Sequence, residues 1–248
     1  MPSSKGSHCS DEGYTQQKSN MLADCDDEDR MGFVRKVYGI LAVQLTITFG
    51  FVALVKTNES LETSLLSMPW LYIIALVLGF SIQCAILCCR SVARSSPMNY
   101  ILLFTFTLCW TFLVGFICAT YDAAVVISAA MMTMVLTISL TLYAWFTTSD
   151  FTQLCGRYVC LGLLMIICIS MTMSLLSMLV FEFTDTYIPF AAGFGVIIYG
   201  LFLLIDTQMV AGGRKYELSI DDYVVGALIL YLDIVMIFLE LLRVFGGR

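Results

Sequence analysis

Apolar residues run in long blocks along this chain, and short polar connections separate the blocks. Six blocks of about 20 residues carry no charge: Val37–Val55, Trp70–Cys89, Met98–Tyr121, Ala123–Phe146, Tyr158–Phe181 and Tyr187–Ile205. A seventh block, Tyr223–Phe245, contains Asp233, Glu240 and Arg243. Helices that cross a bilayer need about 20 apolar residues. The pattern therefore predicts an all-α integral membrane protein built as a seven-transmembrane-helix bundle.

Composition agrees with this architecture, because 59% of the residues are hydrophobic and only 13% are charged. The short connections leave no room for a soluble domain, so residues 31–248 are expected to form one membrane domain. Residues 1–30 are polar and end in an acidic cluster, Asp24, Asp26, Asp27, Glu28 and Asp29. With few aromatic residues and no apolar periodicity, this tail is predicted to be disordered.

Basic residues near the ends of the blocks predict the orientation. If the N-terminus is cytosolic, that side receives Arg30, Arg35, Lys36, Arg90, Arg94, Arg157, Arg214 and Lys215. The opposite side then receives Lys56, an asymmetry that fits the excess of Lys and Arg in cytosolic loops. Arg243 and Arg248 depart from it, so the last block either crosses the membrane or re-enters on the cytosolic side. We expect it to cross.

Asp233 lies in the middle of the last apolar block, and Asp206 follows the preceding block. An aspartate near a bilayer centre costs about 2.5–3.5 kcal/mol, so such acids are usually paired, hydrated or functional. At helical spacing, one stripe of the last block reads Gly226, Leu230, Asp233, Ile237, Glu240. A stripe with two acids should face protein or water rather than lipid. The last helix is therefore predicted at the centre of the bundle.

The two aspartates are expected to come into side-by-side contact. At about 1.5 Å per residue, Asp233 lies roughly 15 Å and Asp206 roughly 9 Å from the cytosolic ends of their helices. Two carboxylates side by side in an apolar medium cannot both ionise easily, so we expect the pair to share a proton. Such a pair can sense pH, bind a cation, or act as acid and base.

Two basic residues are candidate partners for buried acids. Arg90 closes the second block on the cytosolic side, where it either reaches a carboxylate or lies among the lipid headgroups. Glu240 and Arg243 are three residues apart, a spacing that favours a local ion pair. The only histidine, His8, lies in the tail, and no Cys/His spacing indicates a metal site. We expect no cofactor and no nucleic-acid partner.

Seven short runs occur in a specific order: Phe33-Val-Arg-Lys-Val-Tyr-Gly-Ile-Leu, Asp150-Phe-Thr, Asp206-Thr-Gln, Gly213-Arg-Lys, Leu218-Ser-Ile-Asp-Asp-Tyr, Tyr231-Leu-Asp-Ile and Leu241-Leu-Arg-Val-Phe-Gly. Together they resemble the transmembrane Bax inhibitor motif family. The resemblance is closest to its lifeguard branch, which includes the glutamate-receptor-associated-type proteins, and it covers about residues 31–246.

The resemblance implies a seven-helix bundle that encloses its last helix, a pH-sensitive calcium leak, and protection from apoptosis. It implies that Asp206 and Asp233 form the pH sensor and ion gate, with calcium as the transported ion, and that Arg90 is a latch on the first of them. Some bacterial relatives carry an acid in the second helix that partners the arginine of the last. This chain has no such acid near Gly79, and Glu240 is the candidate to replace it as the partner of Arg243.

The leading hypothesis is thus a calcium leak channel or cation/proton exchanger of the endoplasmic reticulum, Golgi or plasma membrane, and not an enzyme. One alternative is a non-conducting anti-apoptotic protein that binds apoptosis or calcium-channel proteins. The other is an intramembrane aspartyl protease, which also needs two aspartates on adjacent helices. The residues around the two aspartates here are Leu204-Ile-Asp206 and Tyr231-Leu-Asp233. These sequences differ from the motifs of such proteases.

Overall fold

The computed structural model describes residues 8–154, 187–214 and 217–247, and this part of the chain is helical, without a β-strand. Helix α1 (His8–Thr57) is followed by α2 (Glu59–Leu66), α3 (Pro69–Cys88), α4 (Arg90–Arg94), α5 (Met98–Ala119) and α6 (Ala123–Phe146). A short 3-10 helix, η1 (Phe151–Leu154), comes next. Further along are α8 (Tyr187–Ala211), the 3-10 helix η2 (Ile220–Asp222) and α9 (Tyr223–Gly246).

Six helical segments in these ranges are long and apolar enough to cross a membrane: Glu28–Thr57, Pro69–Cys88, Met98–Ala119, Ala123–Phe146, Ala192–Ala211 and Ile220–Gly246. For the described residues, this confirms the prediction of an all-helical protein with several helices able to span a membrane. The seventh expected span, Tyr158–Phe181, lies outside the described residues, so the count of seven stays a prediction.

Local signals explain where several helices begin and end. Asn58 accepts hydrogen bonds from the backbone amides of Ser60 and Leu61 and thereby caps α2. Pro69 begins α3, where its missing N–H costs no helical hydrogen bond. Gly247 ends α9 with a left-handed φ of 62°, which a residue with a side chain rarely adopts.

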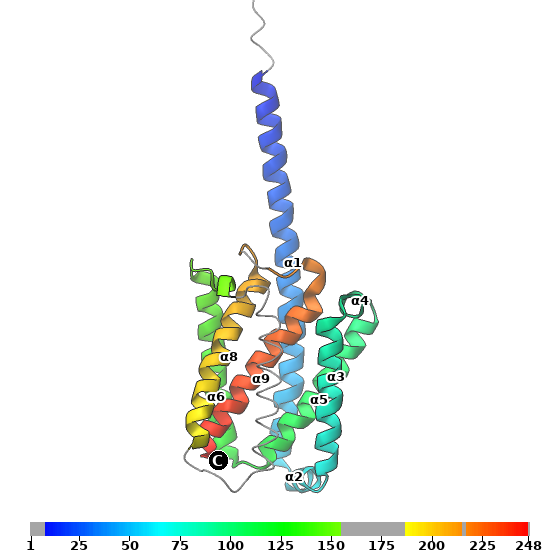
Figure 1. Ribbon diagram of the computed structural model, residues 1–248, viewed down its shortest axis with the longest axis vertical. Helices are drawn as coiled ribbons and strands as arrows, with labels where there is room; N and C mark the ends of the chain where they lie inside the picture. The colour runs from blue at the N-terminus through cyan, green and yellow to red at the C-terminus, as the bar shows by residue number, and fades with distance from the viewer. Residues whose placement is uncertain (1–7, 155–186, 215–216, 248) are drawn as a thin grey trace, which may run out of the picture.

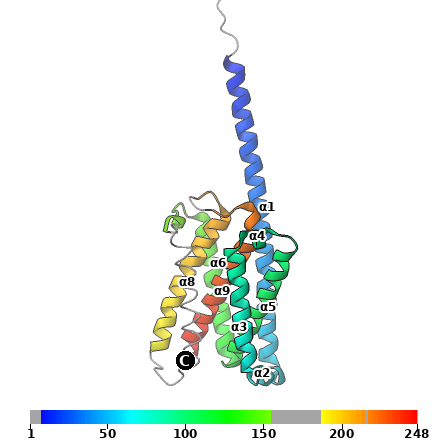
Figure 2. The same cartoon turned by 45° about the vertical axis from the view of Figure 1, so that its right-hand side comes forward.

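Helix α9 is the most buried of the six candidate spans. In the most apolar part of this helix 89% of the positions are buried, against 17% in that of α6. It packs against α1, α5, α6 and α8, so it joins the α1–α3–α5 side of the bundle to the α6–α8 side (Figure 1). It also runs as one continuous helix to the end of the bundle opposite the projecting part of α1, as a crossing helix would (Figures 1 and 2).

The first part of α1 projects away from the bundle (Figure 1). The apolar span within this helix begins at Glu28, and the acidic residues come before it and at its start. A helical segment without a packing partner is marginal in water. A projecting helix of this kind does not test the disorder expected for residues 1–30, which stays a prediction.

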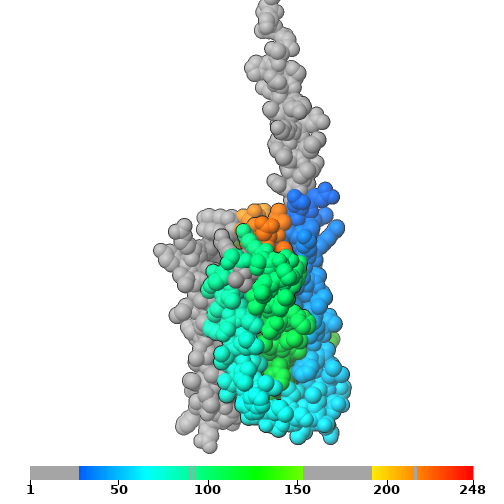
Figure 3. Space-filling view, turned by 90° about the vertical axis from the view of Figure 1, so that its right-hand side faces the viewer, coloured from blue at the N-terminus to red at the C-terminus, as the bar shows by residue number. Residues whose placement is uncertain are grey.

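The outer surfaces of the helices are apolar. On α3, Trp70, Ile73 and Val77 are each more than half exposed, and this helix lies on the face shown in Figure 3. On α6, Ile127, Met131 and Val135 are exposed in the same way. Backbone polar groups are satisfied within each helix, so surfaces of this kind suit contact with lipid. The apolar exterior and the buried acids described below agree with a membrane environment.

Candidate functional site

Asp206 and Asp233 lie on two neighbouring antiparallel helices. Asp206 is within the last two turns of α8, and Asp233 is in the first half of α9. The short connection between these helices brings the end of α8 beside the beginning of α9 (Figures 1 and 2). Both side chains are buried, with residue exposures of 1% for Asp206 and 4% for Asp233.

The two carboxyl groups contact each other through a side-chain hydrogen bond. An ionised carboxylate can only accept hydrogen bonds, so a bond between two carboxyl groups requires a proton on one of them. If that proton left, two negative charges would face each other in an apolar interior, where repulsion is much stronger than in water. The pair is therefore an arrangement whose stability depends on one proton.

Each acid also has acceptor capacity to spare. Within the described part of the chain, neither Asp206 Oδ1 nor Asp233 Oδ2 has a hydrogen-bond partner. Leaving a buried polar atom unpaired costs about 1–3 kcal/mol, so such atoms in a native protein call for an explanation. Each of these two carboxyl oxygens can accept a hydrogen bond from a donor group or a water molecule, or it can coordinate a cation.

A resident calcium ion would need more ligands than this pair supplies. Ca²⁺ takes about six to eight oxygen ligands. Over residues 8–154, 187–214 and 217–247, no group of three or more His, Cys, Asp or Glu side chains lies close enough to hold a metal ion. Asp206 and Asp233 alone therefore supply too few oxygen ligands for a calcium site.

Gln208 and Arg214 attach the C-terminal end of α8 to the segment that follows α6. Gln208 donates to the Ser149 carbonyl at 3.0 Å and accepts from the Phe151 amide at 2.9 Å. Arg214 donates to the carbonyls of Thr147 and Thr148, at 2.6 and 3.1 Å. These contacts fix the turn of α8 that follows Asp206.

Arg90 is the first residue of α4, directly after Cys89, which caps the C-terminal end of α3. Its backbone position at this end of the bundle is described, but its side chain is not. Its expected role as a latch on Asp206 therefore stays a prediction.

Glu240 and Arg243 pair with each other on α9, with Arg243 Nη1 3.1 Å from Glu240 Oε1. Glu240 lies about two helical turns beyond Asp233. It also faces α8, because a Cβ added at Gly195 would lie 2.8 Å from Glu240 Cδ. The glycine leaves room for the acid. The structure thus places this pair apart from the two aspartates along the α8–α9 interface.

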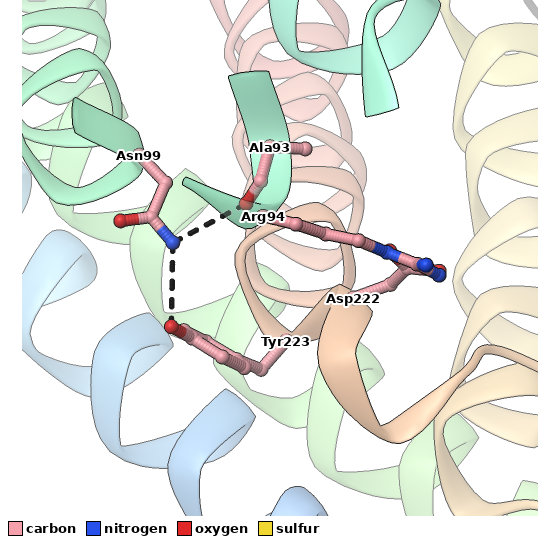
Figure 4. A network of polar contacts seen from close by, with 5 residues as sticks. All are labelled: Ala93, Arg94, Asn99, Asp222 and Tyr223. Atoms are coloured by element: carbon pink, nitrogen blue, oxygen red, sulfur yellow. Dashed lines mark hydrogen bonds and ion pairs between the residues drawn. The ribbon is translucent and has the colours of Figure 1, made fainter. Parts of the chain in front are cut away.

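A second arginine, Arg94, holds the start of α9. Its Nε and Nη2 atoms donate to the two Asp222 carboxylate oxygens at 2.7 and 2.9 Å (Figure 4). The hydrogen bond and the charge of Asp222 raise the pKa of Arg94 above its ordinary value. Nearby, the Asn99 amide donates to the Ala93 carbonyl and to the Tyr223 hydroxyl, at 3.2 and 3.3 Å. Segments α4 and α5 therefore anchor the first turn of α9.

Sequence reasoning missed a hydroxyl cluster on another face of α9. The Thr48 hydroxyl lies 3.0 Å from the Thr111 hydroxyl and 2.8 Å from the Tyr231 hydroxyl. One turn away, Gln44 donates to Thr107 at 2.9 Å. The spacing of four residues, in 44 and 48 on α1 and in 107 and 111 on α5, is the signal that could have revealed two facing polar stripes.

Comparisons with known proteins support one family. The model of the family described as "Inhibitor of apoptosis-promoting Bax1" matches residues 30–248. Protein lifeguard 3 of Homo sapiens is 34% identical over 223 residues, which cover 90% of this chain and 71% of the relative. Protein lifeguard 3 of Mus musculus is 32% identical, covering 100% of this chain and 80% of the relative. Bax inhibitor 1 of Schizosaccharomyces pombe is 28% identical, covering 91% of this chain and 80% of the relative.

Proposed function

Because this chain belongs to the family of inhibitors of apoptosis-promoting Bax1, we propose that it is an anti-apoptotic membrane protein that leaks calcium from an intracellular store. In this proposal the other six of its seven spans surround α9, its N-terminus is cytosolic, and its membrane is that of the endoplasmic reticulum or Golgi. Calcium is the transported ion rather than a resident cofactor. The family is described by its inhibition of apoptosis-promoting Bax1 and not by an enzymatic reaction, so we propose no enzymatic activity.

One observation carries the proposed gate: the hydrogen bond between the buried Asp206 and Asp233 carboxyl groups. With one shared proton the bond holds α8 and α9 together, and the path between them is closed. Loss of that proton leaves two adjacent carboxylates that repel each other and attract cations. The helices then separate, and calcium passes between the unpaired oxygens. Arg90 would add to the closed state by neutralising charge at the cytosolic mouth.

The purified protein in liposomes tests this function without any partner protein. We expect calcium efflux that rises as the pH increases from about 5 to about 8, because the shared proton is lost over this range. Asp206→Asn keeps the size of the side chain and can donate a hydrogen bond at every pH, so its efflux should no longer depend on pH. The matched control is Asp122→Asn, which changes an exposed acid at the start of α6.

Efflux no greater than that of empty liposomes would contradict the leak and favour a protein that acts by binding others. Efflux that keeps its pH dependence in Asp206→Asn would instead contradict the gate alone.

A further inference from the structure

Arg30 connects α1 to the end of the helix that bears Asp206. Its side chain donates four hydrogen bonds to backbone carbonyls. Nη2 reaches Met209 at 2.7 Å and Val210 at 2.9 Å, Nε reaches Ala211 at 3.3 Å, and Nη1 reaches Leu218 at 2.7 Å. The first three acceptors form the last turn of α8, and the fourth belongs to the connection to α9. One side chain therefore holds three segments together.

Helix physics explains why an arginine suits this position. The last carbonyls of an α-helix have no partner within the helix, and they form the negative end of its dipole. A guanidinium group offers five N–H donors in one plane and keeps its charge at any physiological pH. Arg30 thus satisfies several carbonyls at once while its positive charge opposes the dipole.

The backbone at Gly212 leaves the space that this guanidinium occupies. Gly212 has a left-handed φ of 82°, and a Cβ built on it would lie 2.6 Å from Arg30 Cζ. Gly213 also has a left-handed φ, of 69°, but a Cβ there would meet nothing within 4 Å. The two neighbouring glycines therefore share their backbone constraint, and only the first makes room for Arg30.

The same helix α1 also contacts the helix that bears Asp233. Thr48 on α1 bonds the Tyr231 hydroxyl, which is two residues before Asp233 on α9. Arg30 meanwhile holds the carbonyls that follow Asp206 by three to five residues, about 4.5–7.5 Å along the α8 axis. Helix α1 thus has a hydrogen-bonded attachment to each aspartate-bearing helix, beside ring contacts such as Phe49 with Phe238, and its rigid length fixes their relative position.

We propose that Arg30 is a positioning residue of the carboxyl gate: through it, α1 holds α8 where Asp206 meets Asp233. The proposal rests on the proposed function, since it names the group that sets how easily the gate opens. Arg30 does not itself titrate in this range. The charged groups around it are Glu217, which acts on it from the connection to α9, and Glu28 and Asp29 on its own helix. Arg30 therefore changes the gate only by changing the cost of separating α8 from α9.

The test uses two variants that break the contact from opposite sides. Arg30→Ala removes the donors, and its matched control is Arg35→Ala, an exposed arginine on the same helix. Gly212→Ala displaces the guanidinium, and Gly213→Ala imposes similar backbone strain without touching it. For each full-length protein, calcium efflux from liposomes is measured against pH, and hydrogen exchange is measured over residues 209–218.

We expect Arg30→Ala and Gly212→Ala to speed exchange in this segment and to move the midpoint of the efflux curve to lower pH. A shift of about one pH unit corresponds to a tenfold change in the opening equilibrium. Each control should keep the midpoint of the wild type. Arg30→Lys keeps the charge but not the planar donors, so it should shift the midpoint by less than Arg30→Ala.

Faster exchange with an unchanged midpoint would show that Arg30 only stabilises the end of α8, and it would overturn the proposal while leaving the gate intact. An unchanged exchange pattern and midpoint would overturn it as well. Absence of efflux from the wild type would instead remove the proposed function on which it rests.

Discussion

Two faces of α9 carry polar groups in the apolar core, and they differ in chemistry. Towards α8, Asp233 bonds Asp206, and an oxygen of each acid has no partner among the described residues. Towards α1 and α5, the Tyr231 hydroxyl joins Thr48, which in turn joins Thr111. Hydroxyl groups donate and accept hydrogen bonds at any physiological pH, whereas a carboxyl pair bonds only while it holds a proton.

The contrast separates a fixed interface from one that can change. The hydroxyl face keeps α9 against α1 and α5 whatever the pH. The carboxyl face is the one that a proton can open, because its single bond turns into repulsion when the proton leaves. A gate needs both kinds of interface, since one helix must stay in place while its neighbour separates from it.

The largest expected effect concerns stability against pH. The folded wild type holds the shared proton, whereas exposed aspartates in the unfolded chain release theirs well below neutral pH. Its free energy of unfolding should therefore fall as the pH rises, by at most about 1.4 kcal/mol per pH unit for one proton. Asp233→Asn should remove this slope, because its amide bonds Asp206 without a shared proton. Thermal unfolding in detergent micelles from about pH 5 to about pH 8 measures how the unfolding free energy of the wild type and of Asp233→Asn changes with pH. Equal slopes in the two proteins would contradict the distinction between the two faces.

A smaller, pH-independent effect is expected on the hydroxyl face. Thr48→Val keeps the shape of the side chain but leaves the Tyr231 and Thr111 hydroxyls with one partner fewer. Unfolding free energy should drop by about 1–3 kcal/mol, the usual cost of an unpaired buried polar group. Thr107→Val, which removes the bond from Gln44 and a bond to the Leu103 carbonyl within α5, is the matched control and should cost less. A stability loss in Thr48→Val that varies with pH would contradict the assignment of this face as fixed.

The smallest effect is expected at the exposed Arg94–Asp222 pair shown in Figure 4. The Arg94 side chain is 38% exposed, and water and salt screen ion pairs at such positions. Arg94→Ala should leave the melting temperature close to that of the wild type, and the small difference should vanish at high salt. A large loss of stability that persists in high salt would show that α4 supports α9 much more than an exposed ion pair can.

The helices were largely predictable because apolar length is a property of each segment alone. The predicted block Ala123–Phe146 coincides with α6. The predicted block Met98–Tyr121 and helix α5 both start at Met98. Helix α8 extends six residues past the predicted end at Ile205, since Asp206, Thr207 and Gln208 are polar and yet remain buried in the helix. A prediction from hydropathy ends the helix at such residues, because hydropathy contains no information about the neighbouring helices that bury them.

The candidate site was predictable only in part. Asp206 and Asp233 stand out because acids are rare in apolar blocks, and the structure places them in contact. In the sequence, Arg30 is only one of several basic residues expected on the cytosolic side, although in the structure it binds four backbone carbonyls. Its acceptors lie about 180 positions away in the chain. Because every residue has a backbone carbonyl, residue types do not reveal which carbonyls accept from Arg30. Contacts of this kind follow from the packing of helices and not from the pattern of any one of them.

The central claim is that one proton shared by Asp206 and Asp233 keeps the path closed. Infrared spectroscopy of the protein in liposomes, recorded against pH beside calcium efflux from the same sample, tests it most directly. We expect a protonated-carboxyl band that is absent from Asp233→Asn and that disappears in the wild type with the same midpoint at which efflux rises. A band that persists while efflux rises, or one that also remains in Asp233→Asn, would contradict it.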